Sequence, residues 1–534
     1  MLSQKKRKVK AEFIIKNWLN LLWKLYFSVE LVVINMVFLW QRNIGGFIHI
    51  MSAFSDILSN FITQKQTKVL SLARYCELDR STMYKFMNGK RNPPSREILE
   101  KMAHFMHLTP VEFQHLEEAW NISRTGASLY YKRKSVENFI THFPSQPVGD
   151  ADLQFFTLYE QSVSQDSGCT VLSSQQHINY QLHQMLLKEC GSESGKIALF
   201  LQSDYDFLFK LLAALPASDH LQIDHILCLT NKDEFTKEHE LVNLKYLHTI
   251  FPLYFAGLNY NTWYFYDKIH SHYHNFNLFP CMILTSEAAI TCTADYQSGL
   301  LYNSPEILDM LWQMFYNYQN QCQPLFRTTV FTPENYIEVF QSMFYSEFET
   351  SSLIGIQPEA CITPFLSSQI LQDIFNREIP EAALILSEAE QAFRKNMNKL
   401  SSHQFSIYFT AGGMMQFAKT GRTEEIPDVF YRPLTKSERI VILEGILNCC
   451  ENGTYRILQK PLNSLPRNLH LCICGNTGTM IFRCNNGQSV VLTVNEYSFI
   501  NTFQDYLENM EDSSFYTPKD AVAFIRQLID SLKE

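Results

Sequence analysis

Residues 67–95 constrain the fold of this chain more than any other segment, because their apolar positions follow two short helical periods joined by a tight turn. In the second period, Met83, Phe86 and Met87 lie at positions i, i+3 and i+4 and form one face that can be buried. The polar and cationic residues of the first turns of this helix then face outward, and a basic loop closed by two prolines follows. Such a helix fits the major groove of DNA, so the pattern predicts a helix-turn-helix.

The sequence on both sides of this segment favours a small all-helical domain. Apolar residues at helical spacing precede it within 54–62 and follow it within 98–106, and Thr109-Pro110 begins a further helix. Asp79 or Ser81 can cap the second helix of the pair. We therefore expect five short helices in about 70 residues.

This arrangement resembles the helix-turn-helix domains of the Cro/phage-repressor (XRE) family, in which the second and third of five helices read DNA. The resemblance covers roughly residues 54–116, and the residues that carry it are Leu72-Ala73, Leu78, Arg80-Ser81-Thr82-Met83, Asn88-Gly89-Lys90-Arg91, Pro94-Ser95 and Leu108-Thr109-Pro110. Two positions depart from the family. Gln is usual where Val69 stands, and Gly is usual where Glu77 stands. Glu77 must therefore adopt a left-handed backbone conformation, or the turn must differ.

The resemblance implies a transcriptional regulator that reads operator DNA, with double-stranded DNA as its partner. The side chains expected at base edges are those of Arg80, Ser81, Tyr84 and Lys85. Those expected at phosphates are Thr82, Asn88, Lys90 and Arg91. Because one such helix specifies too few base pairs, we expect a homodimer on half-sites about one helical turn apart.

Charge divides the chain as expected for a DNA-binding module attached to a sensor. Residues 1–50 carry 8 Lys/Arg and 2 Asp/Glu, and residues 51–134 carry 13 and 8. The remaining 400 residues carry 24 and 44, so this part is strongly acidic. An acidic body repels DNA, so contact with DNA is expected in the basic N-terminal part alone. A basic cluster at 131–134 could touch the phosphate backbone or form a solvated linker face.

Beyond residue 150 the pattern changes to alternating strands and helices. We therefore predict a multidomain chain, with an all-α five-helix repressor-type helix-turn-helix domain followed by a large mixed α/β region. The expected parts are an N-terminal extension at 1–50, the helix-turn-helix domain at 51–120, a linker at 121–150, an α/β sensor domain at 151–345, and a second α/β sensor or dimerisation domain at 346–534. Both α/β halves end in paired strands, a glycine-containing turn and a helix, so internal duplication is a hypothesis.

The first 50 residues join a basic run to an apolar stretch at 25–40 that is interrupted by Glu30 and Asn35. A spanning helix needs about 20 mostly apolar residues, and a central Glu is costly there. Three interpretations remain open. The segment is an upstream stretch translated by mistake before Met51, a membrane anchor with a basic flank that stays inside, or a helix that packs elsewhere.

The α/β region offers few candidates for chemistry. His270, His272 and His274 alternate as metal ligands on a strand would, but an exposed aromatic loop is the commoner explanation, so no metal site is predicted. Asp204 and Asp206 follow a strand and could bind a polyol or cation, or cap the next helix. Thirteen scattered cysteines suggest neither a disulfide framework nor a zinc site.

The first half of this region faintly resembles phospholipase D-like folds that serve as sensor domains in some bacterial regulators. Its catalytic His-x-Lys-x4-Asp motif is absent from this sequence, as are G-x-S-x-G, H-E-x-x-H and dinucleotide fingerprints. We therefore predict that the chain is not an enzyme and needs no cofactor. The overall prediction is a bacterial cytoplasmic regulator with an unknown small-molecule or peptide effector. The alternatives are a membrane-tethered regulator and an enzyme-like α/β body with a DNA-binding appendage.

Overall fold

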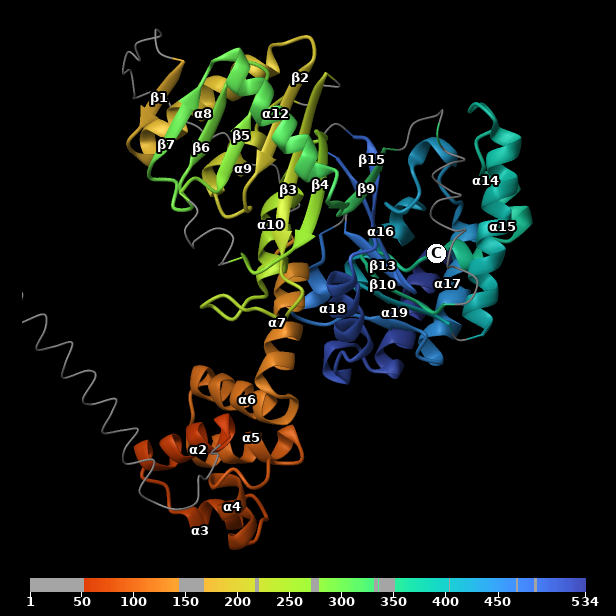
Figure 1. Cartoon of the computed structure of the whole chain (residues 1–534). Helices are drawn as coiled ribbons and strands as arrows, with labels where there is room; N and C mark the ends of the chain where they lie inside the picture. The colour runs from red at the N-terminus through yellow and green to blue at the C-terminus, as the bar shows by residue number, and fades with distance from the viewer. Residues whose placement is uncertain are drawn as a thin grey trace, which may run out of the picture. The chain divides into compact units, whose positions relative to one another are not determined.

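The computed structural model describes residues 52–143, 168–216, 220–269, 278–330, 335, 351–402, 404–466, 469–484 and 487–534. These residues divide into two compact units, the first ending at Tyr130 and the second beginning at Tyr131 (Figure 1). The N-terminal extension at 1–50 and the three alternating histidines lie outside the described residues. Within the described ranges, no helix combines the length and the apolar composition needed to cross a membrane.

The described part of the first unit contains five complete helices, as the sequence predicted. They are α2 (Ala53–Gln64), α3 (Val69–Tyr75), α4 (Arg80–Met87), α5 (Arg96–Phe105) and α6 (Pro110–Thr125). Their apolar faces meet in one core that includes Phe54, Leu72, Met83, Leu99 and Trp120. The fifth helix is longer than expected, because a capping box at Thr109 and Glu112 starts it and Gly126 ends it.

The turns of this unit use left-handed backbone at residues other than glycine. The φ angles are 49° at Gln66, 58° at Glu77 and 52° at His107, each just after the end of a helix. The expectation for Glu77 is therefore confirmed. The departure from the family's glycine changes the residue and not the turn, and the Cβ costs on the order of 1 kcal/mol.

Glycine at position 77 is expected to stabilise the first unit by about 0.5–1 kcal/mol, because glycine adopts a positive φ without a steric penalty. Alanine is the matched control. It also removes the contact between Glu77 and Lys101 Nζ at 3.4 Å, but it keeps the Cβ. Thermal unfolding followed by circular dichroism measures both variants. An equal gain for alanine and glycine would contradict this explanation of the turn.

The segment expected as a linker contains a further helix, α7 (Ala127–Thr141), and the division between the two units falls inside it. From Tyr131 onward this helix belongs to the second unit. Its side chains Val136, Phe139 and Ile140 are buried there. This part of the expected linker is therefore an element of the α/β core.

The second unit contains two mixed sheets. The first has eight strands in the order β1-β7-β6-β5-β2-β3-β4-β8. Its strands are β1 (Cys169–Leu172), β2 (Gly195–Phe200), β3 (Leu221–Leu229), β4 (Asn259–Tyr266), β5 (Cys281–Leu284), β6 (Ala289–Cys292), β7 (Gly299–Tyr302) and β8 (Gln323–Pro324). Its helices are α8 (Gln175–Cys190), α9 (Asp206–Ala213), α10 (Val242–Phe255) and α12 (Pro305–Gln319). We call residues 169–324 the first lobe.

The second sheet has seven strands in the order β12-β11-β10-β13-β14-β15-β9. Its strands are β9 (Phe326–Val330), β10 (Leu353–Gln357), β11 (Phe405–Phe409), β12 (Tyr455–Ile457), β13 (His470–Cys474), β14 (Thr477–Arg483) and β15 (Ser489–Val494). Its helices are α14 (Ser368–Ile374), α15 (Ala382–Ser401), α16 (Ala411–Thr420), α17 (Lys436–Glu451), α18 (Tyr497–Glu508) and α19 (Pro518–Lys533). We call residues 326–534 the second lobe.

Seven strands of the first sheet follow the topology of the second sheet, and β8 is an additional edge strand of the first. In the first, β2, β3 and β4 are parallel, and β5, β6, β7 and β1 continue from β2 as antiparallel neighbours. In the second, β10, β11 and β12 are parallel, and β13, β14, β15 and β9 continue from β10 in the same way. In each lobe a helix follows the last hairpin strand, α12 in the first and α18 in the second. This correspondence supports the internal duplication hypothesis, and the α/β prediction for this region is confirmed.

Alternate side chains of each strand enter different cores. On β2, Ile197 and Leu199 face a core shared by both lobes, whereas Ala198 faces a smaller core under α12. On β11, Tyr408 faces the shared core, whereas Ile407 and Phe409 face the helices of the second lobe. Aromatic contacts join the lobes, including that of Phe255 with Phe482 at a ring-centroid distance of 4.5 Å. The two lobes therefore fold as one body.

Candidate nucleic-acid interface and a buried polar cavity

The start of α4 is fixed by a side-chain cap. The Asp79 carboxylate accepts a hydrogen bond from Thr82 N at 2.8 Å, and the Thr82 hydroxyl donates a second at 2.7 Å. These bonds, the one from the hydroxyl above all, hold the pKa of Asp79 well below its usual range. Of the two caps that the sequence allowed, Asp79 and Ser81, the structure uses Asp79. Thr82, expected at a phosphate, already donates its hydroxyl proton to this cap.

The orientation of α4 is set by its buried face. Met83 and Phe86 are 0% and 1% exposed in the core of the unit. The opposite face is open to solvent, and the exposed side chains of the predicted set are Arg80, Ser81, Tyr84, Lys85, Asn88, Lys90 and Arg91. The guanidinium of Arg80 lies over the ring of Tyr84, 5.4 Å from its centroid. The structure thus brings all seven to one helix and the loop that follows it.

The basic loop after α4 is held in place by hydrogen bonds. Gly89 has a φ of 67°, and both Lys90 N and Arg91 N donate to Lys85 O, at 2.9 and 3.3 Å. Further along, the indole of Trp120 donates to Pro93 O at 2.9 Å. Lys90 and Arg91 therefore extend from a loop whose backbone is fixed beside the end of α4.

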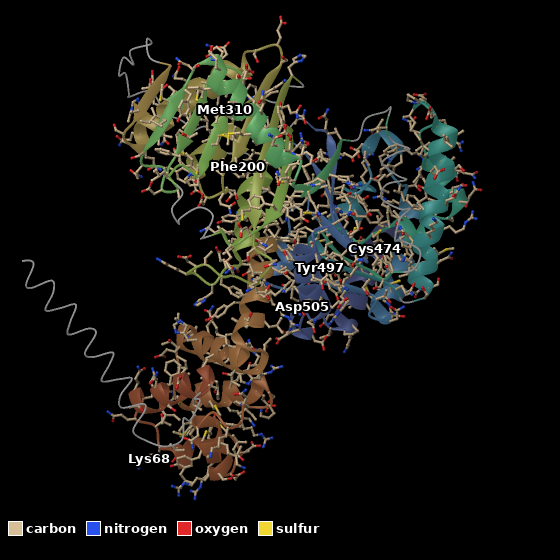
Figure 2. All side chains as sticks on the ribbon, in the orientation of Figure 1. Lys68, Phe200, Met310, Cys474, Tyr497 and Asp505 are labelled. Carbon is tan, nitrogen blue, oxygen red and sulfur yellow. The ribbon has the colours of Figure 1, made fainter. Side chains whose placement is uncertain are left out.

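The pattern of ion pairs leaves this face cationic. In the first unit, Lys65 pairs with Glu112, Arg96 with Glu100 and Glu117, and Lys101 with Glu77 and Glu97. Within the described residues, no carboxylate pairs with Lys85, Lys90 or Arg91. Lys68, an exposed cation next to Val69 at the start of α3, is labelled in Figure 2. No sequence pattern singled out Lys68, although it stands beside Val69, where the Cro/phage-repressor (XRE) family usually has Gln.

The basic cluster at 131–134 is occupied within the second unit. Arg133 Nε and Nη2 donate to the two Asp505 oxygens at 2.8 and 2.9 Å, a bidentate pair. Lys132 Nζ lies 3.2 Å from Asp233, and Lys134 pairs with Glu137. Lys132 and Arg133 therefore fasten α7 to acidic residues of the body, whereas the partner of Lys134 lies within α7 itself.

A second candidate site is a cavity of about 60 Å³ inside the second lobe. Its polar lining consists of Gln357, Cys361, Asn396, Glu425, His470, Cys472 and Thr479. We call this space the polar cavity. The lining comes from β10, the segment after β10, α15, β11, the segment after α16, β13 and β14. Because these residues are scattered over more than 100 positions, no local sequence motif could have predicted that they lie together.

The polar cavity groups acidic, thiol and imidazole side chains. Cys361 Sγ lies 3.5 Å from Glu425 Oε1, and His470 Nε2 lies 3.5 Å from Glu359 Oε2. Burial is the main cause that raises the pKa of Glu425 to about 7, although hydrogen bonds oppose the shift. A carboxyl with this pKa can donate or accept a proton near neutral pH.

An unmatched acceptor points into the polar cavity. Asn396 is 4% exposed, and its Nδ2 donates to Thr363 Oγ1 at 2.8 Å. Its Oδ1 has no hydrogen-bond partner among the described residues. Such groups usually meet water or a ligand, so the cavity suits a small polar molecule that donates hydrogen bonds. Among the described residues, no His/Cys/Asp/Glu cluster has the geometry to hold a metal ion.

The other sequence candidates have structural roles. Asp204 accepts a hydrogen bond from the Tyr296 hydroxyl at 2.6 Å, and Asp206 is the first residue of α9. Gly475 lies in the hairpin between β13 and β14 with a φ of 59°, as its turn signal predicted.

Comparison with protein-family models and with curated proteins gives no match to this chain. Among solved structures, TrmBL2, an archaeal chromatin protein described with a novel mode of DNA binding, is 12% identical at a TM-score of 0.20 and covers 46% of this chain and 84% of its own. Phosphatidylserine synthase from Haemophilus influenzae Rd KW20 is 9% identical at a TM-score of 0.21, and the match covers 75% of this chain and 98% of the synthase. Polyphosphate kinase from Porphyromonas gingivalis is 10% identical at a TM-score of 0.20, and the match covers 73% of this chain and 59% of the kinase. These similarities assign no family to the chain.

One prediction is corrected by these comparisons. The sequence analysis predicted that the chain is not an enzyme, because known catalytic motifs are absent. Two of the three similar structures are enzymes, and they match 75% and 73% of this chain.

Proposed function

We propose that this chain is a transcriptional regulator that binds operator DNA through α4. The observation that carries the proposal is the exposed, unpaired cationic face of α4 and its following loop, held in orientation by the buried Met83 and Phe86. The resemblance to the Cro/phage-repressor (XRE) family supports it, since the five helices and the αL turn at Glu77 occur where that family has them.

The proposed contacts divide into two kinds. Arg80, Ser81, Tyr84 and Lys85 project from the first two turns of α4, where a helix in the major groove reaches base edges. Phosphates are assigned to Asn88, Lys90 and Arg91, with Thr82 contributing through the cap that it shares with Asp79. We add Lys68 to the phosphate contacts.

The body is proposed to sense an effector. The polar cavity supplies a buried acceptor at Asn396 and a titratable carboxyl at Glu425, so we infer a small polar effector. The regulator is proposed to act as a homodimer in the bacterial cytoplasm, since one α4 reads too few base pairs.

The salt dependence of DNA binding tests the assignment of the phosphate contacts. Lys90→Ala is expected to weaken binding to all duplexes alike and to lower the slope of log affinity against log salt by about 1. Lys101→Ala is the matched control, because Lys101 is occupied by Glu77 and Glu97 on another face. Fluorescence anisotropy over a salt series gives both slopes. Equal slopes for the two variants would contradict the assignment of Lys90 as a phosphate contact.

A further inference from the structure

An unusual surface lies along α12 in the first lobe. From Met310 to Gln319 this helix carries no charged residue. Met310, Met314 and Tyr318 lie at i, i+4 and i+8, and they are 51%, 42% and 45% exposed. Tyr318 stacks on Phe200 of β2 at a ring-centroid distance of 5.3 Å, so the apolar surface continues onto the sheet. Met310 and Phe200 are labelled in Figure 2. Absence of charge together with Met and Tyr is typical of the buried centre of a protein interface.

The internal duplication identifies the counterpart of this surface. Both α12 and α18 follow the last hairpin strand of their sheets, and their N-caps are Ser304 and Glu496. Counted from these caps, three positions are buried in both helices against their own sheets: Leu308 with Ile500, Leu311 with Phe503, and Phe315 with Leu507. The alignment therefore matches equivalent faces of the two helices.

The two helices differ on the outer face. The counterparts of Met310 and Met314 are Thr502 and Tyr506, which are 4% and 7% exposed. Other elements cover this side of α18. Arg133 of α7 pairs with Asp505, the neighbour of Tyr506, and Tyr506 lies in the same core as Val136 of α7. The same face is thus covered by a helix in the second lobe and open in the first.

We propose that the outer face of α12, defined by Met310, Met314 and Tyr318, is the surface through which a second copy of this chain pairs. A ridge of residues at i±4 packs against an identical ridge in a symmetry-related helix. In an antiparallel pair, Glu306 and Asp309 at the start of one helix meet the uncharged end of the other, so like charges stay apart. The choice of a second copy rests on the proposed function, because an operator reader of this kind requires two copies.

Light scattering coupled to size-exclusion chromatography of the full chain tests this surface. The wild-type protein is expected to be a dimer. The variant with Met310→Glu and Met314→Glu is expected to be a monomer, with at least a 100-fold weaker dimerisation constant. Its circular dichroism spectrum should match that of the wild-type protein, because both side chains are exposed within the monomer. The single variant Met314→Lys should also weaken dimerisation. It tests the same surface if the double variant fails to fold.

Met397→Glu on α15 is the matched control, since Met397 is also an exposed helical methionine, at 47%. This variant is expected to remain a dimer. A wild-type monomer, or a folded α12 variant that stays dimeric, would contradict the proposal that α12 forms the dimer interface. A monomer that still selects palindromic DNA overturns the surface and leaves the proposed function standing. A dimer lost through α12 substitution in a protein that selects no DNA supports the surface and overturns the proposed function.

Discussion

Replacement of Lys85 by alanine is expected to lower affinity for the preferred operator by about 1–3 kcal/mol and to relax sequence preference at one base pair. Lys85 is exposed on α4, and within the described residues no carboxylate pairs with it. Its ammonium can therefore reach an acceptor on a base edge without first breaking an ion pair. Removing a contact of this kind should change discrimination between operators more than binding to unrelated DNA.

The comparison with Lys90 makes this expectation specific. Lys90→Ala should weaken operator and unrelated duplexes by the same factor, whereas Lys85→Ala should weaken the operator much more. Competition binding with single-base operator variants measures the difference. If Lys85→Ala weakened every duplex equally, Lys85 would be a phosphate contact and the proposed orientation of α4 would be wrong.

The second large effect concerns Glu425 in the polar cavity. Burial raises the pKa of this carboxyl to about 7 from its ordinary 4.5, so the folded protein binds this proton more tightly than the unfolded chain does. The resulting contribution to stability is fully present below about pH 4.5 and is lost as the pH rises to about 7. Its size is at most about 3 kcal/mol, at roughly 1.4 kcal/mol for each pKa unit.

Glu425→Gln removes this proton-binding group. The unfolding temperature of the variant is therefore expected to rise relative to that of the wild-type protein between about pH 4.5 and 7, and to stay parallel to it above that range. Glu424→Gln is the control, since Glu424 is the next residue and pairs with Arg483 at the surface. A difference between the Glu425 variant and the wild type that does not change with pH would contradict burial of this carboxyl.

The elements that could be predicted from the sequence are those with local signals. Ser304-Pro305 and Thr517-Pro518 give the starts of α12 and α19, because each supplies a residue at the N-cap and proline at the first helical position. The interpretation of residues 67–95 as two helices needed only the spacing of Met83, Phe86 and Met87. Here local periodicity and tertiary packing agree.

What sequence analysis missed depends on distant partners. β10 and β11 are five-residue strands with partners far along the chain, and Gly355 in β10 weakens its strand signal. The interpretation of 121–150 as a linker rested on charge and turn signals near Arg133. The structure pairs this residue with Asp505, which is 372 positions away. The polar cavity likewise required the fold, although Gln202-x-Asp204 and Gln357-x-Glu359 follow equivalent strands and were a usable signal of duplication.

The most direct test of the central claim is selection of bound duplexes from a random DNA pool, using protein that starts at Met51. The account predicts enrichment of a palindromic motif with half-sites about ten base pairs apart. The same selection with residues 51–135 alone should return the half-site, because α4 and its loop lie within this segment. A result in which neither protein enriches any sequence at moderate salt would contradict the assignment of α4 as a DNA-reading helix.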